Sequence, residues 1–352
     1  MGYQCYEDIK TQAVAWRAAL AAVDSLAEDL AAFFAERPSE LLFAACGSPY
    51  YLGLANAALW RERLNLRTIV VPSSEIMLFR DTVLPPMGRP ILFTASRSGE
   101  TTETVRAAEA FAERFPDRTL LVGCRPESKL HQLADMAIVV PEGNEDIIPQ
   151  TRSFGSMYLA AQYLVALLAD DVELTDALRR LPDWLPALFD RWEPVIRRTA
   201  EAGWSSAVFL GGGPLYGVAV EATLKLTEMS LSPAISYHTL EVRHGPRSII
   251  DEETLVVGLG SQRGASHERE VMAEMAEETP HVLVLTPESG WNLGETATEI
   301  PLGNRVPEHA LGLLYLPLLQ LLAYHRALHK GVNPDESRNL TSYIELELPD
   351  QG

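Results

Sequence analysis

The sequence predicts an α/β protein made of two related domains, each a parallel sheet with helices on both faces in a three-layer α/β/α sandwich. Two observations predict this fold class. Short apolar runs of strand length alternate with segments of helix length, which is the pattern of a parallel sheet covered on both faces. Three strand-and-turn segments of the first half also recur in the same order in the second half, which indicates an internal duplication.

The first half begins with a helix and continues with five strands. An Ala- and Leu-rich periodicity predicts a helix from Tyr6 to Ala35, which Arg37-Pro38 ends. Apolar runs bounded by turn residues predict the strands that follow. The expected strands are residues 41–45, 68–71, 91–93, 119–123 and 136–140, and the expected helices include about 50–63, 103–111 and 154–168.

The second half repeats this pattern after a helical segment. We expect a first domain at residues 1–170, a helical connection at 171–198, and a second domain with a carboxy-terminal tail at 199–352. Strands are expected at 207–210, 248–250, 254–259 and 281–285, with a helix after the glycine turn at 211–213. The apolar run 310–324 is interrupted by Pro317 and Gln320, so we interpret it as a buried helix that is too short to span a bilayer.

Composition limits the classes of partner. The 352 residues are 47% hydrophobic and 22% charged, and the net charge is 29 − 48 = −19. This charge argues against a nucleic acid or an anionic membrane as the main partner, but not against a phosphorylated small molecule. No signal pattern opens the chain, and Cys5, Cys46 and Cys124 lack the spacing of a disulfide or zinc framework, so we expect a cytoplasmic protein without a bound metal.

A hydroxyl-rich loop follows the strand at residues 91–93. Ser96, Ser98 and Thr101 surround Gly99 at the point where the strand turns into a helix. Free N–H groups at a helix N-terminus favour an anion, hydroxyls add donors, and Arg97 would add a charge. Helix capping by Ser98 and Thr101 is the alternative interpretation of the same residues.

Three charged residues share one face of the helix that follows the second glycine turn. Glu221, Lys225 and Glu228 are spaced i, i+4, i+7 on a helix that is otherwise apolar. They form either an ordinary ladder of ion pairs or a general base whose pKa is tuned by the neighbouring Lys225. His244 lies in a charged Gly-Pro turn, with His238 nearby, and is a second candidate for proton transfer.

These motifs together resemble one family. They are Cys46-Gly47-Ser48, the loop from Ser96 to Thr101, the helix segment Leu224–Glu228, the turn Arg243–Pro246, and the tail Asn333–Thr341. The resemblance is to the tandem sugar isomerase (SIS) domains of the glucosamine-6-phosphate synthase isomerase module and its stand-alone relatives, and it covers nearly the whole chain. Those relatives include amino-sugar-phosphate deaminases or isomerases and fructosamine-phosphate deglycases.

The resemblance implies roles for individual residues. Glu228 matches the glutamate that moves a proton between C1 and C2, and His244 matches the histidine assigned to ring opening, usually donated by the second subunit of a homodimer. It implies no cofactor. The residues that match those around the sugar phosphate are Cys46, Gly47, Ser48, Ser96, Arg97, Ser98, Gly99, Thr101, Gln150 and Thr151.

Three positions depart from the family pattern. Ser342 stands where the synthase tail has a lysine that forms a Schiff base with the sugar, Pro49 stands where many relatives have a serine, and Gln150 replaces a serine or threonine. No glutaminase domain precedes the first motif, so we expect that ammonia is not supplied from glutamine within the chain and that the protein is not a full synthase.

The sequence therefore predicts a deaminase that converts glucosamine 6-phosphate to fructose 6-phosphate and ammonia through proton transfer by Glu228. Three alternatives remain open at this point. The chain could be a deglycase of ketose-phosphate–amino-acid adducts, a simple aldose–ketose isomerase, or a sugar-phosphate sensor without activity.

Overall fold

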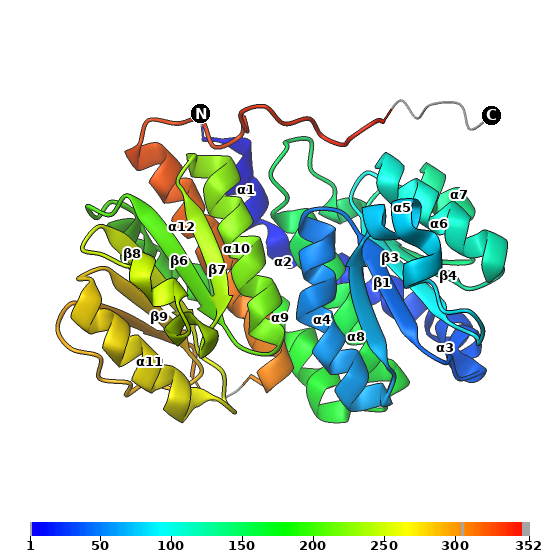
Figure 1. Cartoon of the computed structure of the whole chain (residues 1–352), viewed down its shortest axis with the longest axis horizontal. Helices are drawn as coiled ribbons and strands as arrows, with labels where there is room; N and C mark the ends of the chain where they lie inside the picture. Colours follow the sequence, from blue (N-terminus) through cyan, green and yellow to red (C-terminus); the bar gives the residue numbers. More distant parts are fainter. Residues whose placement is uncertain (1, 304–305, 347–352) are drawn as a thin grey trace. The chain divides into compact units, whose positions relative to one another are not determined.

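A computed structural model describes residues 2–303 and 306–346 of the chain. In the described residues there are two five-stranded sheets in which every pair of neighbouring strands is parallel. The strand orders are β2-β1-β3-β4-β5 and β10-β9-β8-β6-β7, so the second sheet repeats the topology of the first (Figure 1). The predicted fold class and the internal duplication are confirmed.

The chain divides into two compact units, and each holds one sheet. We call them the N-unit (residues 14–148, 152–171 and from 339 onward) and the C-unit (residues up to 13, 149–151 and 172–338). These bounds differ from those expected from the sequence. The amino-terminal segment and the helix expected as a connection belong to the C-unit, and the tail from residue 339 belongs to the N-unit.

The N-unit begins with helices and continues as a doubly wound sheet. Its elements are α2 (Gln12–Ser25), α3 (Ala27–Ala35), β1 (Leu41–Ala45), α4 (Ser48–Leu64), β2 (Thr68–Pro72), α5 (Ser73–Val83), β3 (Ile91–Ser96), α6 (Thr102–Arg114), β4 (Thr119–Gly123), α7 (Lys129–Leu133), β5 (Met136–Val139), η1 (Pro141–Gly143) and α8 (Arg152–Leu168).

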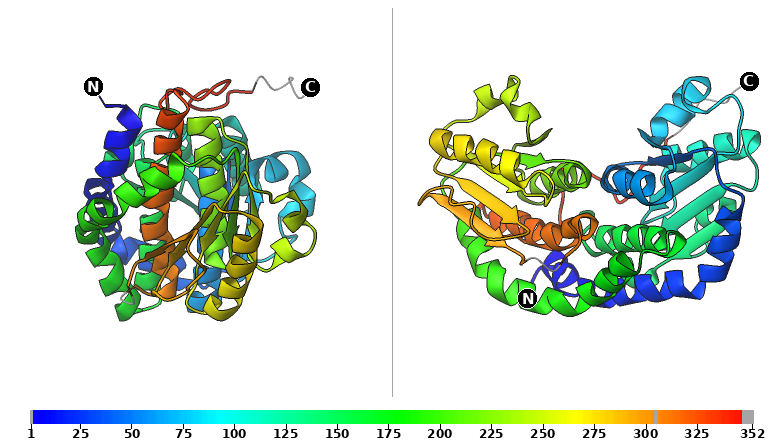
Figure 2. Two further views of the ribbon diagram at one scale, coloured as in Figure 1. Left: turned by 90° about the vertical axis from the view of Figure 1, so that its left-hand side faces the viewer. Right: turned by 90° about the horizontal axis from the view of Figure 1, so that it is seen from below.

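Both faces of this sheet are buried, because successive side chains of a strand point to opposite faces. Leu42 and Leu92 share one core cluster with Phe111 of α6. On the other face the rings of Phe43 and Phe93 lie 4.7 Å apart. Gly53 of α4 has no side chain because a Cβ there would lie 2.3 Å from the Phe43 ring. In Figure 2 each sheet is seen between helices.

The C-unit repeats this arrangement. Its elements are α1 (Gln4–Lys10), α9 (Val172–Ala200), β6 (Ser206–Gly211), α10 (Pro214–Ser230), β7 (Ala234–His238), η2 (Glu241–Arg243), η3 (Pro246–Ile249), β8 (Thr254–Leu259), α11 (Ala265–Glu278), β9 (Val282–Thr286), β10 (Ala297–Pro301), η4 (Glu308–Ala310) and α12 (Leu311–His329).

Two expected elements of the C-unit are corrected. The residues 248–250 are not a strand: they belong to the 3-10 turn η3 and its end, and Ile249 is 51% exposed. The expected connection is the continuous helix α9, which buries Leu178, Leu181 and Phe189 in spite of three internal prolines. The helix expected from Tyr6 to Ala35 is confirmed in extent but is divided into α1, α2 and α3.

The helix α12 is the central helix of the C-unit. Residues Glu308–His329 are long and apolar enough to cross a membrane by length and composition, which corrects the expectation that this run is too short. However, 94% of the apolar window is buried inside the fold, which confirms the buried helix. Polar side chains tie it to neighbours: His325 lies 3.2 Å from Glu193 of α9, and Glu193 accepts a hydrogen bond of 2.7 Å from Lys10 of α1.

Candidate functional site

Two loops meet at the carboxyl edge of the N-unit sheet. β1 and β3 are neighbours in this sheet, but the chain visits β2 on the far side of β1 before it returns to β3. The loops that leave β1 and β3 therefore diverge, and they lead into α4 and α6. Ligands of open α/β sheets bind at such switch points.

The loop after β3 is built as a tight turn with inward donors. The Ser96 hydroxyl accepts a 2.9 Å hydrogen bond from the Gly99 N–H, and the Ser98 hydroxyl accepts one of 3.2 Å from the Glu100 N–H. Gly99 has a φ of 67°, and a Cβ there would lie 2.1 Å from the Ser128 hydroxyl, so only glycine fits. Thr101 is the N-cap of α6 without a side-chain capping bond, so the capping alternative is wrong for its hydroxyl.

The loop after β1 presents the N-terminus of α4. Gly47 adopts φ 58° and ψ −134°, a conformation that favours glycine, and it is the N-cap of a helix whose first residue is Ser48. Ser48 is 3% exposed. The thiol of Cys46 accepts a hydrogen bond of 3.4 Å from the hydroxyl of Thr104 in α6, which joins the two loops. The structure thus brings the predicted phosphate-binding residues of both loops together.

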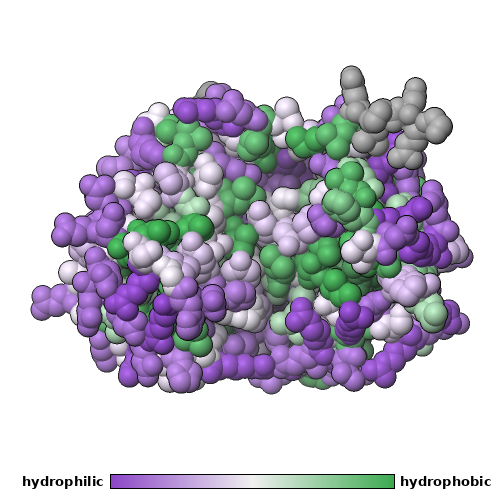
Figure 3. Space-filling view, in the orientation of Figure 1, coloured by the Kyte–Doolittle hydropathy of each residue, from purple (hydrophilic) through white to green (hydrophobic). Residues whose placement is uncertain are grey.

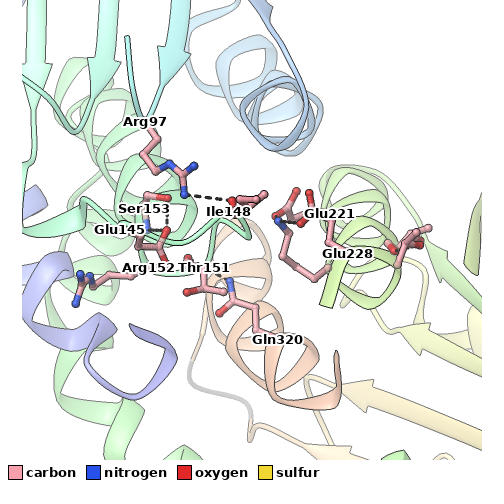
Figure 4. Close-up of polar contacts among 12 residues, drawn as sticks. Arg97, Glu145, Ile148, Thr151, Arg152, Ser153, Glu221, Glu228 and Gln320 are labelled. Carbon is pink, nitrogen blue, oxygen red and sulfur yellow. Dashed lines mark hydrogen bonds and ion pairs between the residues drawn. The ribbon is translucent and has the colours of Figure 1, made fainter. Parts of the chain in front are cut away.

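Arg97 is placed differently from the simple expectation of a charge beside the phosphate. Its guanidinium is 5% exposed and donates to the backbone carbonyls of Ile147 (2.6 Å) and Ile148 (3.2 Å) (Figure 4). It also donates to the Ser342 carbonyl at 3.4 Å. Arg97 therefore braces the segment that precedes Gln150, and its contact with a phosphate stays a prediction.

A buried carboxylate that the sequence analysis missed fixes the start of α8. Glu145 is 3% exposed and accepts hydrogen bonds from the N–H groups of Arg152 (2.7 Å) and Ser153 (3.1 Å) and from the Ser153 hydroxyl (2.5 Å). Figure 4 shows these side chains together. Glu145 lies seven residues before the helix, outside the spacing of a capping box, so local sequence gave no signal for it.

Gln150 and Thr151 lie in a short segment that belongs to the C-unit. Thr151 is fully buried, and its carbonyl accepts a 3.2 Å hydrogen bond from Gln320 of α12, which itself accepts one of 2.8 Å from Gln12. Their role at the sugar stays a prediction.

The charged face of α10 is an ion-pair ladder. The Lys225 ammonium lies 3.4 Å from Glu221 and donates a 2.6 Å hydrogen bond to Glu228. Glu221 and Lys225 are fully buried, whereas the Glu228 side chain is 12% exposed. Among these three, only Glu228 has a carboxylate that solvent reaches, and Lys225 fixes its orientation. The geometry fits both interpretations of the pattern, since a base can be held by such a ladder.

His244 lies on an exposed turn between η2 and η3, where the adjacent Gly245 has a φ of 119°. Arginines on either side fasten this turn to α11: Arg243 contacts Glu274 at 2.6 Å, and Arg247 contacts Glu278 at 2.6 Å. The expected turn is confirmed. His238 is distinct from this turn, because it ends β7 and its ring stacks on Tyr216 with centroids 3.8 Å apart.

The cysteines are not poised as nucleophiles. Burial raises the pKa of Cys46, of Cys5 and of Cys124, the last to about 12. All three are free thiols. Within residues 2–303 and 306–346, His, Cys, Asp and Glu form no group that could hold a metal ion.

Comparison with known proteins assigns the family. The sequence model of the SIS domain matches residues 35–167 and 202–330, one match in each half of the duplication. The chain belongs to the SIS domain family. Among solved structures similar to this SIS protein is glucosamine-6-phosphate deaminase from Thermotoga maritima, which is 28% identical with a TM-score of 0.77 over 94% of this chain and 100% of that one.

Other SIS proteins are similar over much of the chain. Tagatose-6-phosphate ketose/aldose isomerase from Escherichia coli is 23% identical, with a TM-score of 0.84 over 100% of this chain and 98% of that one, and shows the shared fold. Glutamine–fructose-6-phosphate aminotransferases (isomerizing) from Methanothermobacter thermautotrophicus and Vibrio cholerae are 28% and 29% identical over 87% and 86% of this chain. The chain spans about half the length of these relatives, 52% and 51%.

Proposed function

We propose that this SIS protein deaminates glucosamine 6-phosphate to fructose 6-phosphate and ammonia. The observation that carries the proposal is the Glu228 carboxylate, which is partly exposed and held by the buried Lys225 at 2.6 Å. The likeness to the deaminase from Thermotoga maritima, at 28% identity over 94% of the chain, supports this choice of substrate.

In this proposal the N-unit loops bind the phosphate. The hydroxyls of Ser48, Ser96 and Ser98 supply donors on the two loops that follow β1 and β3, at the starts of α4 and α6. Helix N-termini favour a phosphate dianion through their free N–H groups and their dipole. The binding energy of the phosphate, which does not react, holds the sugar carbons in place for proton transfer.

Proton transfer is then assigned to Glu228. With the sugar ring open, its carboxylate removes the proton from C2 and returns it to C1. The C1 oxygen gains a proton and the nitrogen loses one in the same conversion, so the amino aldose becomes a 2-imino compound with a hydroxyl on C1. Water adds to the imine carbon, and the C2–N bond breaks to release ammonia and leave the C2 ketone. His244 is proposed to open the ring. Ser342 lacks the amine that a Schiff base with the open-chain sugar requires, so no covalent step is assigned to it.

The test measures ammonia and fructose 6-phosphate formed from glucosamine 6-phosphate by the wild type and by Glu228→Gln. We expect a fall in kcat of about 10²- to 10⁴-fold with a smaller change in KM, because the amide cannot accept the proton. Glu277→Gln, an exposed position on α11, is the matched control and should retain activity. Ammonia formation by Glu228→Gln at the wild-type rate would show that the base is assigned wrongly.

The same proton transfer serves other substrates. A panel of fructosamine 6-phosphates with an amino acid on nitrogen, and of aldose and ketose 6-phosphates without nitrogen, separates the deaminase from a deglycase and from a simple isomerase. Binding of the sugar phosphates without turnover of any of them would instead favour a sensor.

We also propose a homodimer in which His244 completes the site of the second copy. Exposed apolar side chains near this turn support an interface, since Leu240 is 48% and Ile249 is 51% exposed. Apolar residues interrupt the polar surface on the face shown in Figure 3. A histidine on an exposed turn is well placed for donation to a neighbouring copy.

A further inference from the structure

The second copy of the duplication keeps the anion-binding turn of the first. The segment Ser96-Arg97-Ser98-Gly99 follows β3, and Ser261-Gln262-Arg263-Gly264 follows β8, so both have the pattern Ser-x-x-Gly. The Ser261 hydroxyl accepts a 2.8 Å hydrogen bond from the Gly264 N–H, as Ser96 does from Gly99 at 2.9 Å. The second copy has Arg263 in place of Ser98 and so lacks that hydroxyl, but it keeps the turn itself.

The neighbouring glycine turn is also repeated. Gly213 has φ 53° and ψ −127°, which matches φ 58° and ψ −134° at Gly47, and each is the N-cap of the helix that follows. β6 and β8 are paired in the C-unit as β1 and β3 are paired in the N-unit. The two loops that form the proposed phosphate crevice thus have counterparts at the same edge of the C-unit sheet.

One helix position distinguishes the copies. The buried residues of α6 include Thr104, Ala107, Ala108 and Phe111, and those of α11 are Glu268, Val271, Met272 and Met275. Both sets have the spacing 0, 3, 4, 7, so Glu268 occupies the position of Thr104 on the buried helix face, although it follows its turn glycine by four residues and Thr104 follows Gly99 by five. Thr104 donates to the Cys46 thiol at 3.4 Å and accepts from the Ser73 hydroxyl at 3.3 Å. The first copy has a short neutral side chain where the second has a carboxylate.

The Glu268 carboxylate lies inside the second turn. It is 5% exposed and accepts hydrogen bonds from the Ser261 N–H (2.7 Å) and the Ser261 hydroxyl (2.9 Å). A Cβ on Gly212 or on Gly264 would lie 3.1 Å or 2.7 Å from its Oε1 atom, so both glycine turns enclose it. Burial raises its pKa, although the Ser261 bonds oppose the shift. The loop after β8 therefore already binds a carboxylate, which is the side chain of Glu268.

We propose that Glu268 is a built-in ligand that fills the anion site of the C-unit and so confines phosphate binding to the N-unit. Phosphate monoesters are the ligand class that the emptied loop would take. A bound phosphate would need the same N–H and hydroxyl donors as Glu268, and the carboxylate would repel its charge. A hollow of about 590 Å³, lined in part by Gln262, Ser266 and Arg269, adjoins the turn and gives a phosphate access.

The test counts inorganic phosphate bound per chain at saturation, by equilibrium dialysis with labelled phosphate. Glu268→Thr places the residue of the first copy in the second, and we expect it to bind one more phosphate than the wild type. Glu268→Gln is the matched control, because the amide still fills the loop, and its count should equal that of the wild type. An unchanged count for folded Glu268→Thr would overturn the proposal.

The reciprocal substitution tests the same proposal even if Glu268→Thr does not fold. Thr104→Glu places a carboxylate at the same position of the N-unit, and it should abolish phosphate binding there, whereas Thr104→Val should not. Retained binding by Thr104→Glu would count against the proposal. The inference rests on the proposed function only for the phosphate site of the N-unit. If the wild type binds no phosphate, the proposed N-unit site is wrong. Phosphate binding that appears in Glu268→Thr would still support the role of Glu268.

Discussion

Lys225 is a fully buried cation between two carboxylates, and its removal has a predictable effect on stability. In the wild type the Lys225 ammonium lies 3.4 Å from the carboxylate of the fully buried Glu221. Lys225→Met removes this positive charge and leaves the Glu221 carboxylate in place. We expect a loss of about 3 to 5 kcal/mol in the free energy of unfolding, because an uncompensated buried charge is strongly destabilising. Urea unfolding measures this loss.

A second variant tests whether the ion pair is the cause. The double variant Lys225→Met with Glu221→Gln removes both charges, so it should recover part of the stability lost by Lys225→Met. Additive destabilisation by the two substitutions would show that Glu221 and Lys225 do not interact through their charges.

For individual residues, the sequence predicted which charged and hydroxyl side chains belong to the candidate site but not their hydrogen-bond partners. The spacing of Glu221, Lys225 and Glu228 predicted a shared helix face, because helical periodicity is local. The partners of Arg97 and the cap supplied by Glu145 depend on backbone groups that the fold brings close, and no local pattern encodes them.

Strands that are buried on both sides were all predicted from the sequence. β1, β3, β4, β8 and β9 are buried along their whole length and so appear as continuous apolar runs. The missed strands β7 and β10 are the two edges of the C-unit sheet, and most of their residues are only partly buried. The apolar pair Ile249-Ile250 was mistaken for a strand because it follows a Gly-Pro turn, whereas the fold leaves Ile249 exposed.

Glu193 joins three helices of the C-unit and should make their packing pH-dependent. Burial raises its pKa, but hydrogen bonds from Lys10 and Tyr6 outweigh this effect, and the net pKa is lowered. A lowered carboxyl pKa contributes stability above the unfolded pKa, and this contribution is lost as the pH falls through the folded pKa. Glu193→Gln should therefore be less stable than the wild type at pH 7, by about 1 kcal/mol.

The measurement is urea unfolding at pH 7 and again near pH 3.5, below the usual carboxyl pKa of about 4.3. The difference between wild type and Glu193→Gln should shrink at the lower pH. Glu201→Gln, an exposed position just beyond α9, is the control and should change stability little at either pH. A difference that persists in acid would mean that the charge of Glu193 is not responsible.

For the whole molecule, the proposed dimer gives a prediction about assembly. Ile249→Asp places a charge on the exposed apolar turn near His244 and should shift the chain from dimer to monomer in size-exclusion chromatography with light scattering. Ser248→Asp is the neighbouring control, because Ser248 is already polar and exposed. A wild type that elutes as a monomer would contradict the dimer.

The shared site has a separate readout. If His244 completes the site of the other copy, mixing inactive Glu228→Gln with inactive His244→Ala and allowing subunits to exchange should restore part of the activity. One site in each mixed dimer then has both residues intact. No recovery from mixed dimers would place His244 and Glu228 of one chain in the same site.

The division of the chain between the two units also affects how it is made. The N-unit is nearly complete once residue 171 has been synthesised, but α1 belongs to the C-unit and packs against α9 and α12. At synthesis rates of about 5 to 20 residues per second, the roughly 300 residues between α1 and α12 take about 15 to 60 s, and α1 waits at least that long for α12 to leave the ribosome. During that interval the buried side of α1, with Cys5 and Ile9, has no core to enter. Folding of this protein on the ribosome should therefore begin with residues 14–171 and end with its first helix.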